Sequence, residues 1–279
     1  MDDFKKFLSE IETDSQDRFN NYRVEDMENL AYVEDEAYLE EPTWLKSKEK
    51  IACLAIDLTG STKLSARKNP NTMAKLYDYF TQNIVNILNE ERLKADYQDI
   101  KGDGVFALYE GNSALEKAFV GGVLFKTYFE NYIVPKFKKE FNIELQCKIS
   151  INEEKALVKR IGKRKFGNRD LDNEVWAGTL VNSAYELLSL YGEIKEGDTN
   201  FLSQRSLVII PEEIYEYYSE NYRDIIILSC GCEGRERSVL WKKFNVPTEK
   251  QDTLGTYIYY GATVWCNNCG DECISGLID

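Results

Sequence analysis

The fold is decided around residues 51–62, which read IACLAIDLTGST. The first six of these residues are apolar, a length typical of a buried strand. The run stops at Asp57, and after a turn containing Gly60 the apolar residues between 73 and 88 recur every three or four positions. That spacing predicts an amphipathic helix. The sequence therefore indicates a buried strand, a short turn that begins with an acidic residue, and a helix.

The elements that follow define the fold class. Residues 99–109 form two short extended runs around a Gly-Asp-Gly turn, which predicts a β-hairpin. We then expect a long helix over 113–141, a strand over 145–151 and a helix over 179–191. A last strand, helix and strand are expected at 207–210, 211–222 and 225–228. The order strand, helix, strand, strand, helix, strand is ferredoxin-like, so the fold class is α+β with a mainly antiparallel sheet and flanking helices.

Composition excludes several kinds of chemistry. The 279 residues include no histidine, which removes Ser-His-Asp and Cys-His triads and zinc sites built on histidine. No apolar run is long enough to span a membrane, and the N-terminus lacks the apolar stretch of a signal peptide. Seven cysteines without a signal peptide are typical of thiols or thiolate ligands in a reducing compartment. We therefore expect a cytoplasmic protein without a membrane partner.

Charged residues are distributed unevenly along the chain. Residues 1–42 hold 14 Asp and Glu against 4 Lys and Arg, a net charge of −10 out of −13 for the whole chain. Such a segment repels nucleic acid and anionic membranes, so we expect neither as a partner. Phe4, Phe7, Leu8 and Ile11 have the spacing of a short amphipathic helix. We expect an acidic segment over 1–45, a main domain over 46–228 and a Cys-rich segment over 229–279.

Two carboxylates stand at the ends of predicted strands. Asp57 ends the buried strand, and Asp103 occupies the hairpin turn between Gly102 and Gly104. If the two strands are neighbours, both carboxylates emerge at one edge of the sheet, where two hard divalent cations with oxygen ligands fit between them. Each residue alone has a simpler explanation, Asp57 as a helix N-cap and Asp103 as a turn former. Their joint occurrence favours the metal site.

Three blocks of sequence together resemble the class III nucleotidyl cyclases. They read AIDLTGST (55–62), KGDGVFALY (101–109) and VWAGTLVNSAYELL (175–188), in the order of that family, and the resemblance covers about residues 50–210. It implies the class III cyclase fold, with the catalytic domain in the main domain. It also implies attack of the 3′-oxygen of a nucleoside triphosphate on its own α-phosphorus, with pyrophosphate as the leaving group. The family forms its active sites across a two-fold axis, which implies a homodimer.

The resemblance also implies roles for individual residues. Asp57 and Asp103 would be ligands of two metal ions, Mn²⁺ or Mg²⁺, together with the backbone carbonyl of Leu58. Asn182 would orient the ribose. The turn that would cradle the phosphates contains Thr59, Gly60, Ser61 and Thr62.

The chain departs from the family at two positions. The purine-selecting lysine is replaced by Asp99, and the transition-state arginine by Glu186. A basic cluster precedes the third block and is either a substitute for the missing arginine or a solvated basic hairpin. Its members are Lys159, Arg160, Lys163, Arg164, Lys165 and Arg169. Which of its cations would replace the arginine stays open, and Arg169 is our candidate for a further phosphate-binding residue.

These departures and the NEVWAG segment make the chain resemble the pyrimidine cyclases of the Pycsar anti-phage systems. That resemblance implies manganese dependence, cyclisation of UTP or less often CTP, and cyclic UMP as a second messenger for a separate effector protein. Tyr97 and Asp99 are the base-pocket candidates, because a bulky wall such as Tyr97 favours the smaller pyrimidine ring. The sequence leaves the choice between UTP and CTP open.

Five cysteines near the C-terminus have the spacing of metal ligands. Cys230 and Cys232 form a CxC pair, and Cys266 and Cys269 form a CxxC pair, with Cys273 as an alternative ligand. Four thiolates can bind one structural zinc ion in tetrahedral geometry. The alternative is that they are unliganded thiols in a reducing compartment.

Three other functions remain open at this stage. An adenylate or guanylate cyclase is disfavoured by Asp99, and a catalytically inactive, nucleotide-binding module is favoured by Glu186 but disfavoured by the retained Asp57 and Asp103. A zinc-ribbon protein that binds nucleic acid would need a basic surface, which a pI near 4.8 disfavours. We therefore expect a pyrimidine nucleotide cyclase.

Overall fold

A computed structural model describes residues 2–34, 42–166, 169–192, 207–221, 229–230, 238–239 and 241–262. The chain forms two compact units, one made of residues 1–50 and 155–178 and the other of residues 51–154 and 179–279. Among the described residues, no helix has both the length and the apolar character needed to cross a membrane.

The first unit contains a four-stranded sheet with the strand order β1-β2-β7-β8. Strands β1 and β2 are parallel, and the other pairs are antiparallel. Its small core contains Met27, Leu30, Leu45 and Val158. The elements are α1 (Asp2–Asn21), β1 (Arg23–Met27), η1 (Leu30–Glu34), β2 (Thr43–Ser47), β7 (Leu157–Phe166) and β8 (Arg169–Ala177).

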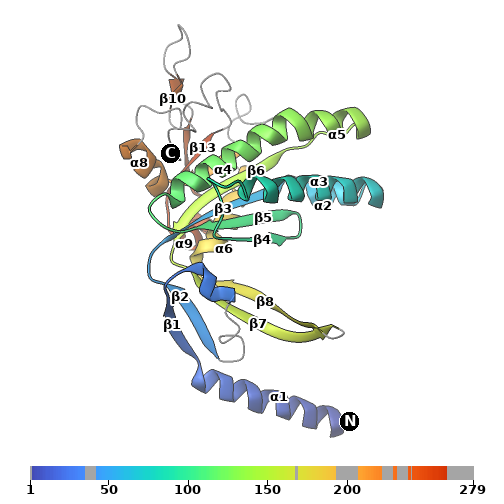
Figure 1. Ribbon diagram of the computed structural model, residues 1–279, viewed down its shortest axis with the longest axis vertical. Helices are drawn as coiled ribbons and strands as arrows, with labels where there is room; N and C mark the ends of the chain where they lie inside the picture. The colour runs from blue at the N-terminus through green and yellow to red at the C-terminus, as the bar shows by residue number, and fades with distance from the viewer. Residues whose placement is uncertain are drawn as a thin grey trace. The chain divides into compact units, whose positions relative to one another are not determined.

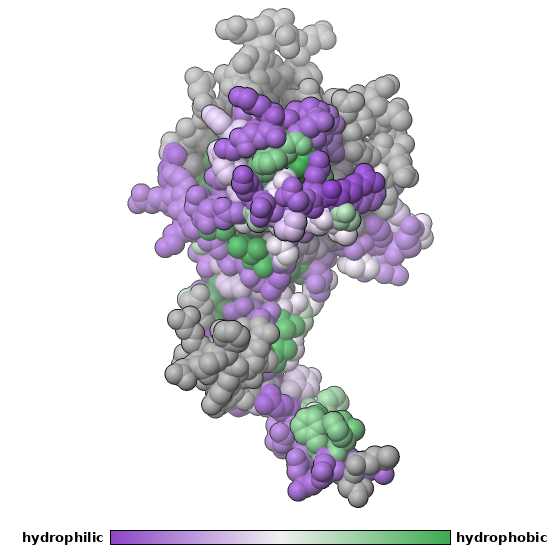
Figure 2. All heavy atoms as spheres, turned by 90° about the vertical axis from the view of Figure 1, so that its right-hand side faces the viewer, coloured by the Kyte–Doolittle hydropathy of each residue, from purple (hydrophilic) through white to green (hydrophobic). Residues whose placement is uncertain are grey.

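Helix α1 confirms the predicted N-terminal helix but extends it to 20 residues. Its apolar residues are exposed: Phe4 is 76% exposed, and Phe7, Leu8 and Ile11 are each at least 45% exposed. Figure 2 shows apolar side chains gathered on the surface of this helix.

The second unit is built on a seven-stranded sheet with the order β12-β13-β9-β6-β3-β5-β4, in which, among the described strands, only β6 and β9 are parallel. Figure 1 shows β6, β3, β5 and β4 of this sheet in that order. Its central strands β6-β3-β5-β4 have the order of a ferredoxin-like sheet, as the element order predicted. The strands are β3 (Ile51–Leu58), β4 (Tyr97–Lys101), β5 (Gly104–Tyr109), β6 (Cys147–Glu154), β9 (Leu207–Pro211), β12 (Lys242–Asn245) and β13 (Ile258–Ala262). The short strands β10 (Ser229–Cys230) and β11 (Ser238–Val239) pair separately.

Helices cover both faces of this sheet. The larger core joins one face, including Leu54 and Ile56 of β3, to residues of α3, α4 and α8. The smaller core joins the other face, including Ile209, to α6. The helices are α2 (Ser61–Ser65), α3 (Pro70–Leu88), α4 (Ala114–Tyr128), the π-helical turn η3 (Phe129–Ile133), α5 (Val134–Phe141), α6 (Thr179–Ser189), α8 (Glu212–Asn221) and α9 (Thr248–Leu254).

Most of the predicted elements are confirmed, with small shifts at their ends. The long helix expected over 113–141 is continuous but contains the π-helical turn η3. The strand expected at 225–228 lies outside the described residues. Strands β12 and β13, which extend the main sheet beyond β9, and helix α9 were not predicted from the sequence.

Candidate active site

The sheet brings the two predicted metal ligands together at one end of its strands. In the antiparallel register of β3 and β5, Ile56 lies opposite Val105, so the next residue of β3, Asp57, lies beside the turn that holds Asp103. The turn requires Gly102, whose φ of 67° is in the left-handed region. The expectation that both carboxylates emerge at the same end of neighbouring strands agrees with this geometry.

Asp57 already faces a cation. It lies opposite Lys148 in the register of β3 and β6, and the Lys148 Nζ atom is 2.9 Å from Asp57 Oδ2. Both side chains are only about one-fifth exposed, at 21% and 22%. Residue 60, not Asp57, is the N-cap of α2, so the helix-cap explanation for Asp57 is wrong. Lys148 was not predicted from the sequence, because its position beside Asp57 depends on strand register rather than on any local motif.

Asp103 is partly buried, and its Oδ2 atom has no hydrogen-bond partner within the described part of the chain. A buried carboxylate oxygen without a partner is costly, and native proteins usually supply a ligand, an ion or water. The donor set therefore fits a hard cation, which favours carboxylate oxygens. Within the described ranges there is no group of three or more Cys, Asp or Glu side chains that could hold a metal by itself. Any ion here would need ligands beyond the two carboxylates.

The turn after Asp57 is tight. Gly60 has a φ of 72° and caps the five-residue helix α2, whose first turn contains Ser61 and Thr62. The Thr59 N–H donates to the Gln146 carbonyl oxygen at 2.8 Å, which fixes the turn to the segment before β6. The expected phosphate-binding turn therefore follows directly after the first carboxylate, and Leu58, whose carbonyl was expected to bind metal, is the last residue of β3.

The positions expected to contact the sugar and the transition state lie on α6. Asn182 is exposed in the first turn of that helix. Glu186 forms an ion pair with Lys250 of α9, whose Nζ atom lies 3.4 Å from Glu186 Oε1. The same Lys250 ammonium donates to Ser189 Oγ at 2.7 Å. A cation therefore lies beside Glu186, the position for which the resemblance implied an arginine, and this cation was not predicted from the sequence.

The two base-pocket candidates share one face of β4. The Tyr97 ring lies 6.0 Å from the Phe106 ring between centroids. Asp99 Oδ1 accepts a hydrogen bond from the Ile100 N–H at 2.7 Å, and Asp99 Oδ2 lies 2.5 Å from Lys101 Nζ. The Asp99 carboxylate is therefore paired with its own neighbour Lys101.

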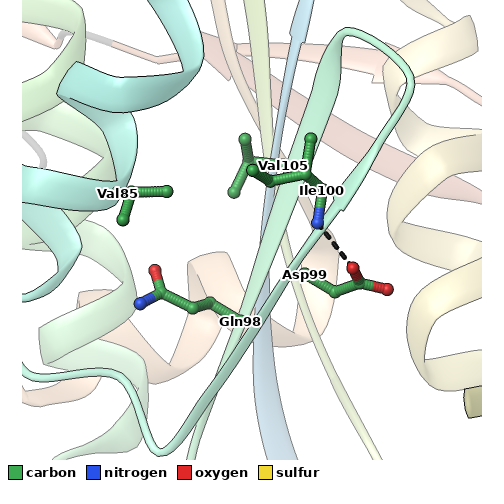
Figure 3. Close-up of a pocket in the computed structure, with 5 residues that line it drawn as sticks. All are labelled: Val85, Gln98, Asp99, Ile100 and Val105. Carbon is green, nitrogen blue, oxygen red and sulfur yellow. Dashed lines mark hydrogen bonds between the residues drawn. The ribbon is translucent and has the colours of Figure 1, made fainter. Parts of the chain in front are cut away.

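A cavity of about 310 Å³ lies beside this hairpin. Figure 3 shows that Gln98 points toward α3, whereas the Asp99 carboxylate points the other way, toward α6. Tyr97 does not line the cavity. Its lining residues are Val85, Gln98, Asp99, Ile100 and Val105.

Tyr185 of α6 is a further polar residue at this edge that the sequence analysis missed. Its ring packs edge-on against Phe106, with 6.5 Å between centroids. Its hydroxyl is buried and has no hydrogen-bond partner among the residues that the structure describes. Burial raises the pKa of the phenol above its ordinary value, and the negative charges of neighbouring groups raise it further. The charged neighbours are the carboxylates of Asp57, Asp99 and Asp103.

The remaining predicted site residues cannot be placed. Arg169 belongs to β8 of the first unit, and its side chain lies outside those described. Cys232, Cys266, Cys269 and Cys273 also lie outside the described residues, and for Cys230 only the backbone strand is described. The structure therefore neither brings together nor separates the expected zinc ligands.

Two solved nucleotidyl cyclases have a similar fold. The adenylyl cyclase CyaB from P. aeruginosa superposes with a TM-score of 0.53 and 14% identity over 80% of this chain and 97% of that chain. The catalytic core of a rhodopsin-guanylyl cyclase with converted specificity, in complex with ATPalphaS, superposes with a TM-score of 0.54 and 13% identity. The match covers 80% of this chain and 98% of that chain. At such low identity the likeness establishes the fold alone. The fold is that of the class III nucleotidyl cyclases.

Sequence relatives define the family more narrowly. A uridylate cyclase from Propioniciclava tarda is 30% identical over 254 residues, which cover 89% of this chain and 74% of that protein. A uridylate cyclase from Micromonospora echinofusca is 26% identical over 241 residues, which cover 85% of this chain and 71% of that protein. No family model matches the chain. The chain belongs to the uridylate cyclase family and is a nucleotidyl cyclase, which confirms the resemblance identified from the three sequence blocks.

Proposed function

We propose that this protein converts UTP to 3′,5′-cyclic UMP and pyrophosphate, using two divalent cations bound by Asp57 and Asp103. The observation that carries the choice of base is that both curated relatives, which match most of the chain, are named uridylate cyclase. The site geometry supports the proposed cation binding, because two carboxylates lie at the same end of neighbouring strands, beside a tight turn. In the proposed enzyme, Asn182 orients the ribose and the turn at 59–62 binds the phosphates.

Divalent cations at the two carboxylates would lower the pKa of the 3′-hydroxyl and neutralise charge on the leaving pyrophosphate. The chain's own residues would position the substrate around them. Lys148, released from Asp57 when a metal ion takes its place, supplies one positive charge for the triphosphate. Lys250 supplies another beside Glu186, and is an alternative to the basic cluster at 159–169 as the replacement for the missing arginine. A histidine base is not required, which agrees with a chain that has none.

The proposed biological role follows from the Pycsar resemblance. Cyclic UMP would act as a second messenger in anti-phage defence and would be detected by a separate effector protein. We also propose that the enzyme works as a homodimer with its active sites at the interface, as the resemblance implies.

A product assay tests the proposed reaction. The purified protein is incubated separately with UTP, CTP, GTP and ATP in the presence of Mn²⁺, and the products are identified by mass spectrometry. We expect 3′,5′-cyclic UMP from UTP as the main product. Cyclic CMP as the main product would assign the enzyme as a cytidylate cyclase, and cyclic AMP or GMP would overturn the pyrimidine assignment. If no nucleotide is cyclised, the interpretation as an inactive nucleotide-binding module is favoured.

We propose further that the C-terminal cysteines bind one structural zinc ion. The support is the spacing of Cys230 and Cys232 relative to Cys266 and Cys269, which provides four thiolates for a tetrahedral site. Metal analysis of the folded protein is expected to find about one zinc per chain. A Cys266→Ser, Cys269→Ser variant should lose that zinc, whereas Cys53→Ser, which changes a buried cysteine inside β3, should retain it. Folded wild-type protein with almost no zinc would contradict the proposal.

A further inference from the structure

Tyr185 is held firmly at the edge of the sheet that carries the two carboxylates. Its helix, α6, is fixed to β6 by two hydrogen bonds from strand side chains to helix carbonyls. Ser150 Oγ donates to the Ala184 carbonyl oxygen at 2.7 Å, and Asn152 Nδ2 donates to the Leu180 carbonyl oxygen at 3.3 Å. Because Ala184 precedes Tyr185 directly, the position of the tyrosine ring is set by the strand beneath it.

Gly104 leaves room for the tyrosine hydroxyl. A Cβ atom at position 104 would lie 3.2 Å from the Tyr185 hydroxyl oxygen and 3.4 Å from a carbon of its ring. The φ of Gly104 is not in the left-handed region, so its backbone conformation does not require glycine. The glycine after Asp103 therefore allows the hydroxyl to lie against the backbone next to that carboxylate.

The hydroxyl is a hydrogen-bond donor without an acceptor in the described part of the chain. A buried hydroxyl in this state is costly, and native proteins usually have such a group act on a ligand, an ion or a functional partner. A tyrosine phenol is protonated at neutral pH, so this hydroxyl can donate. The chemistry that satisfies it is an anionic oxygen.

Of the three neighbouring carboxylates, Asp103 is the available acceptor for the Tyr185 hydroxyl. Asp57 is paired with Lys148, and Asp99 is engaged by Lys101 and by a backbone N–H. Asp99 Oδ2 and Asp103 Oδ2 both lack a hydrogen-bond partner among the described residues, but Asp99 Oδ2 lies 2.5 Å from Lys101 Nζ, whereas no ion pair within the described part of the chain involves Asp103. A carboxylate that binds a metal through one oxygen commonly accepts a hydrogen bond on the other, and such outer partners orient it.

We propose that Tyr185 is a positioning residue of the metal site, whose hydroxyl donates a hydrogen bond to the Asp103 carboxylate when that carboxylate binds a divalent cation. This inference rests on the proposed function, since it requires a cation at Asp103. It adds a role on α6 that none of the three sequence blocks indicated. The tyrosine holds one oxygen of Asp103, so that the other oxygen faces the cation.

The Tyr185→Phe variant tests the proposal because it removes the hydroxyl and keeps the ring. Mn²⁺ binding is measured by electron paramagnetic resonance in the presence of 3′-deoxy-UTP, which lacks the attacking hydroxyl. We expect Mn²⁺ affinity to fall by about 10- to 100-fold. In turnover assays, the Mn²⁺ concentration for half-maximal rate should rise by a similar factor, while the rate at saturating Mn²⁺ stays near that of the wild type.

Thermal unfolding without metal provides a second readout that does not depend on the loaded enzyme. Removing an unsatisfied hydroxyl should leave the melting temperature unchanged or raise it. The matched control is Tyr218→Phe, because the buried Tyr218 hydroxyl donates to the Leu115 carbonyl oxygen at 2.8 Å. That variant should lower the melting temperature by about 2–4 °C and leave Mn²⁺ affinity unchanged.

The outcomes separate this inference from the proposed function. If Asp103→Asn abolishes Mn²⁺ binding but Tyr185→Phe binds Mn²⁺ as tightly as the wild type, the role of Tyr185 is wrong and the metal site stands. If the wild type binds no more Mn²⁺ than Asp103→Asn, the metal site is wrong and the inference falls with it. A melting temperature of metal-free Tyr185→Phe as low as that of Tyr218→Phe would also overturn it, since the hydroxyl would then have a partner in the metal-free protein.

Discussion

Replacing Asp57 with asparagine is expected to lower cyclase turnover by about a thousandfold or more while the protein stays folded. A metal ion contributes several kcal/mol of charge stabilisation in the transition state, and each 1.36 kcal/mol corresponds to a factor of ten in rate. The fold should tolerate the change, because Asp57 lies at the end of β3 and its Lys148 partner is about one-fifth exposed and can be hydrated. Turnover of UTP and the far-ultraviolet circular dichroism spectrum are the measurements.

The Asp103→Asn variant should show the same loss of turnover but a different effect on stability. Asp57→Asn leaves Lys148 without its ion pair, at a cost of about 1 kcal/mol in the free energy of unfolding. Asp103 Oδ2 has no hydrogen-bond partner in the described residues, so the second variant loses no interaction at that atom. Metal-free Asp103→Asn should therefore be as stable as the wild type or more stable.

The control for both variants is Glu212→Gln. It also breaks an ion pair between a carboxylate and a lysine, because Lys243 Nζ lies 2.9 Å from Glu212 Oε1, but it lies on α8, away from the carboxylate pair. It should retain wild-type turnover. Near-normal activity in either aspartate variant would contradict the two-metal mechanism.

The Phe80→Ala variant is expected to lower the free energy of unfolding by about 3–5 kcal/mol. Phe80 of α3 is fully buried, and its ring packs edge-on against Phe125 at 5.3 Å and Phe129 at 5.8 Å between centroids. Truncation removes these contacts and leaves a cavity between α3 and α4 that the rigid sheet below cannot fill. Since a domain of this kind is stabilised by only about 5–15 kcal/mol, the change is a large fraction of the total.

Urea unfolding measures this loss, and Phe4→Ala is its matched control. The Phe4 side chain is 76% exposed on α1, so its truncation should change the unfolding free energy by less than about 0.5 kcal/mol. A loss of less than about 1 kcal/mol in Phe80→Ala would show that the core around α3 does not pack as described.

Much of the second unit was predictable from local pattern. The apolar run at 51–56, the Gly-Asp-Gly turn and the three- and four-residue spacing in 73–88 each correspond to an element of the structure. These signals are local, because side-chain alternation and turn conformation depend on a few neighbouring residues. Strands β12 and β13 were missed because both are short, and because the pairing of β13 with β9 depends on a contact distant in sequence.

The site was predictable only in part. Asp57 and Asp103 were identified because each follows a recognisable strand signal. Lys148 carries no such signal, and it becomes the partner of Asp57 through the register of β3 and β6. Lys250 similarly reaches Glu186 only because α9 packs beside α6.

The sequence by itself determined the kind of protein: the order of elements, the two carboxylates and the absence of histidine all follow from the order and identity of residues. The tertiary structure decided which groups face the carboxylates. It placed Lys148 against Asp57 and left the hydroxyl of Tyr185 beside Asp103 without an acceptor among the described residues. The physical reason is that a side chain's partner across a sheet depends on strand register and helix docking. These are set by the packing of the whole core, and no local motif encodes them.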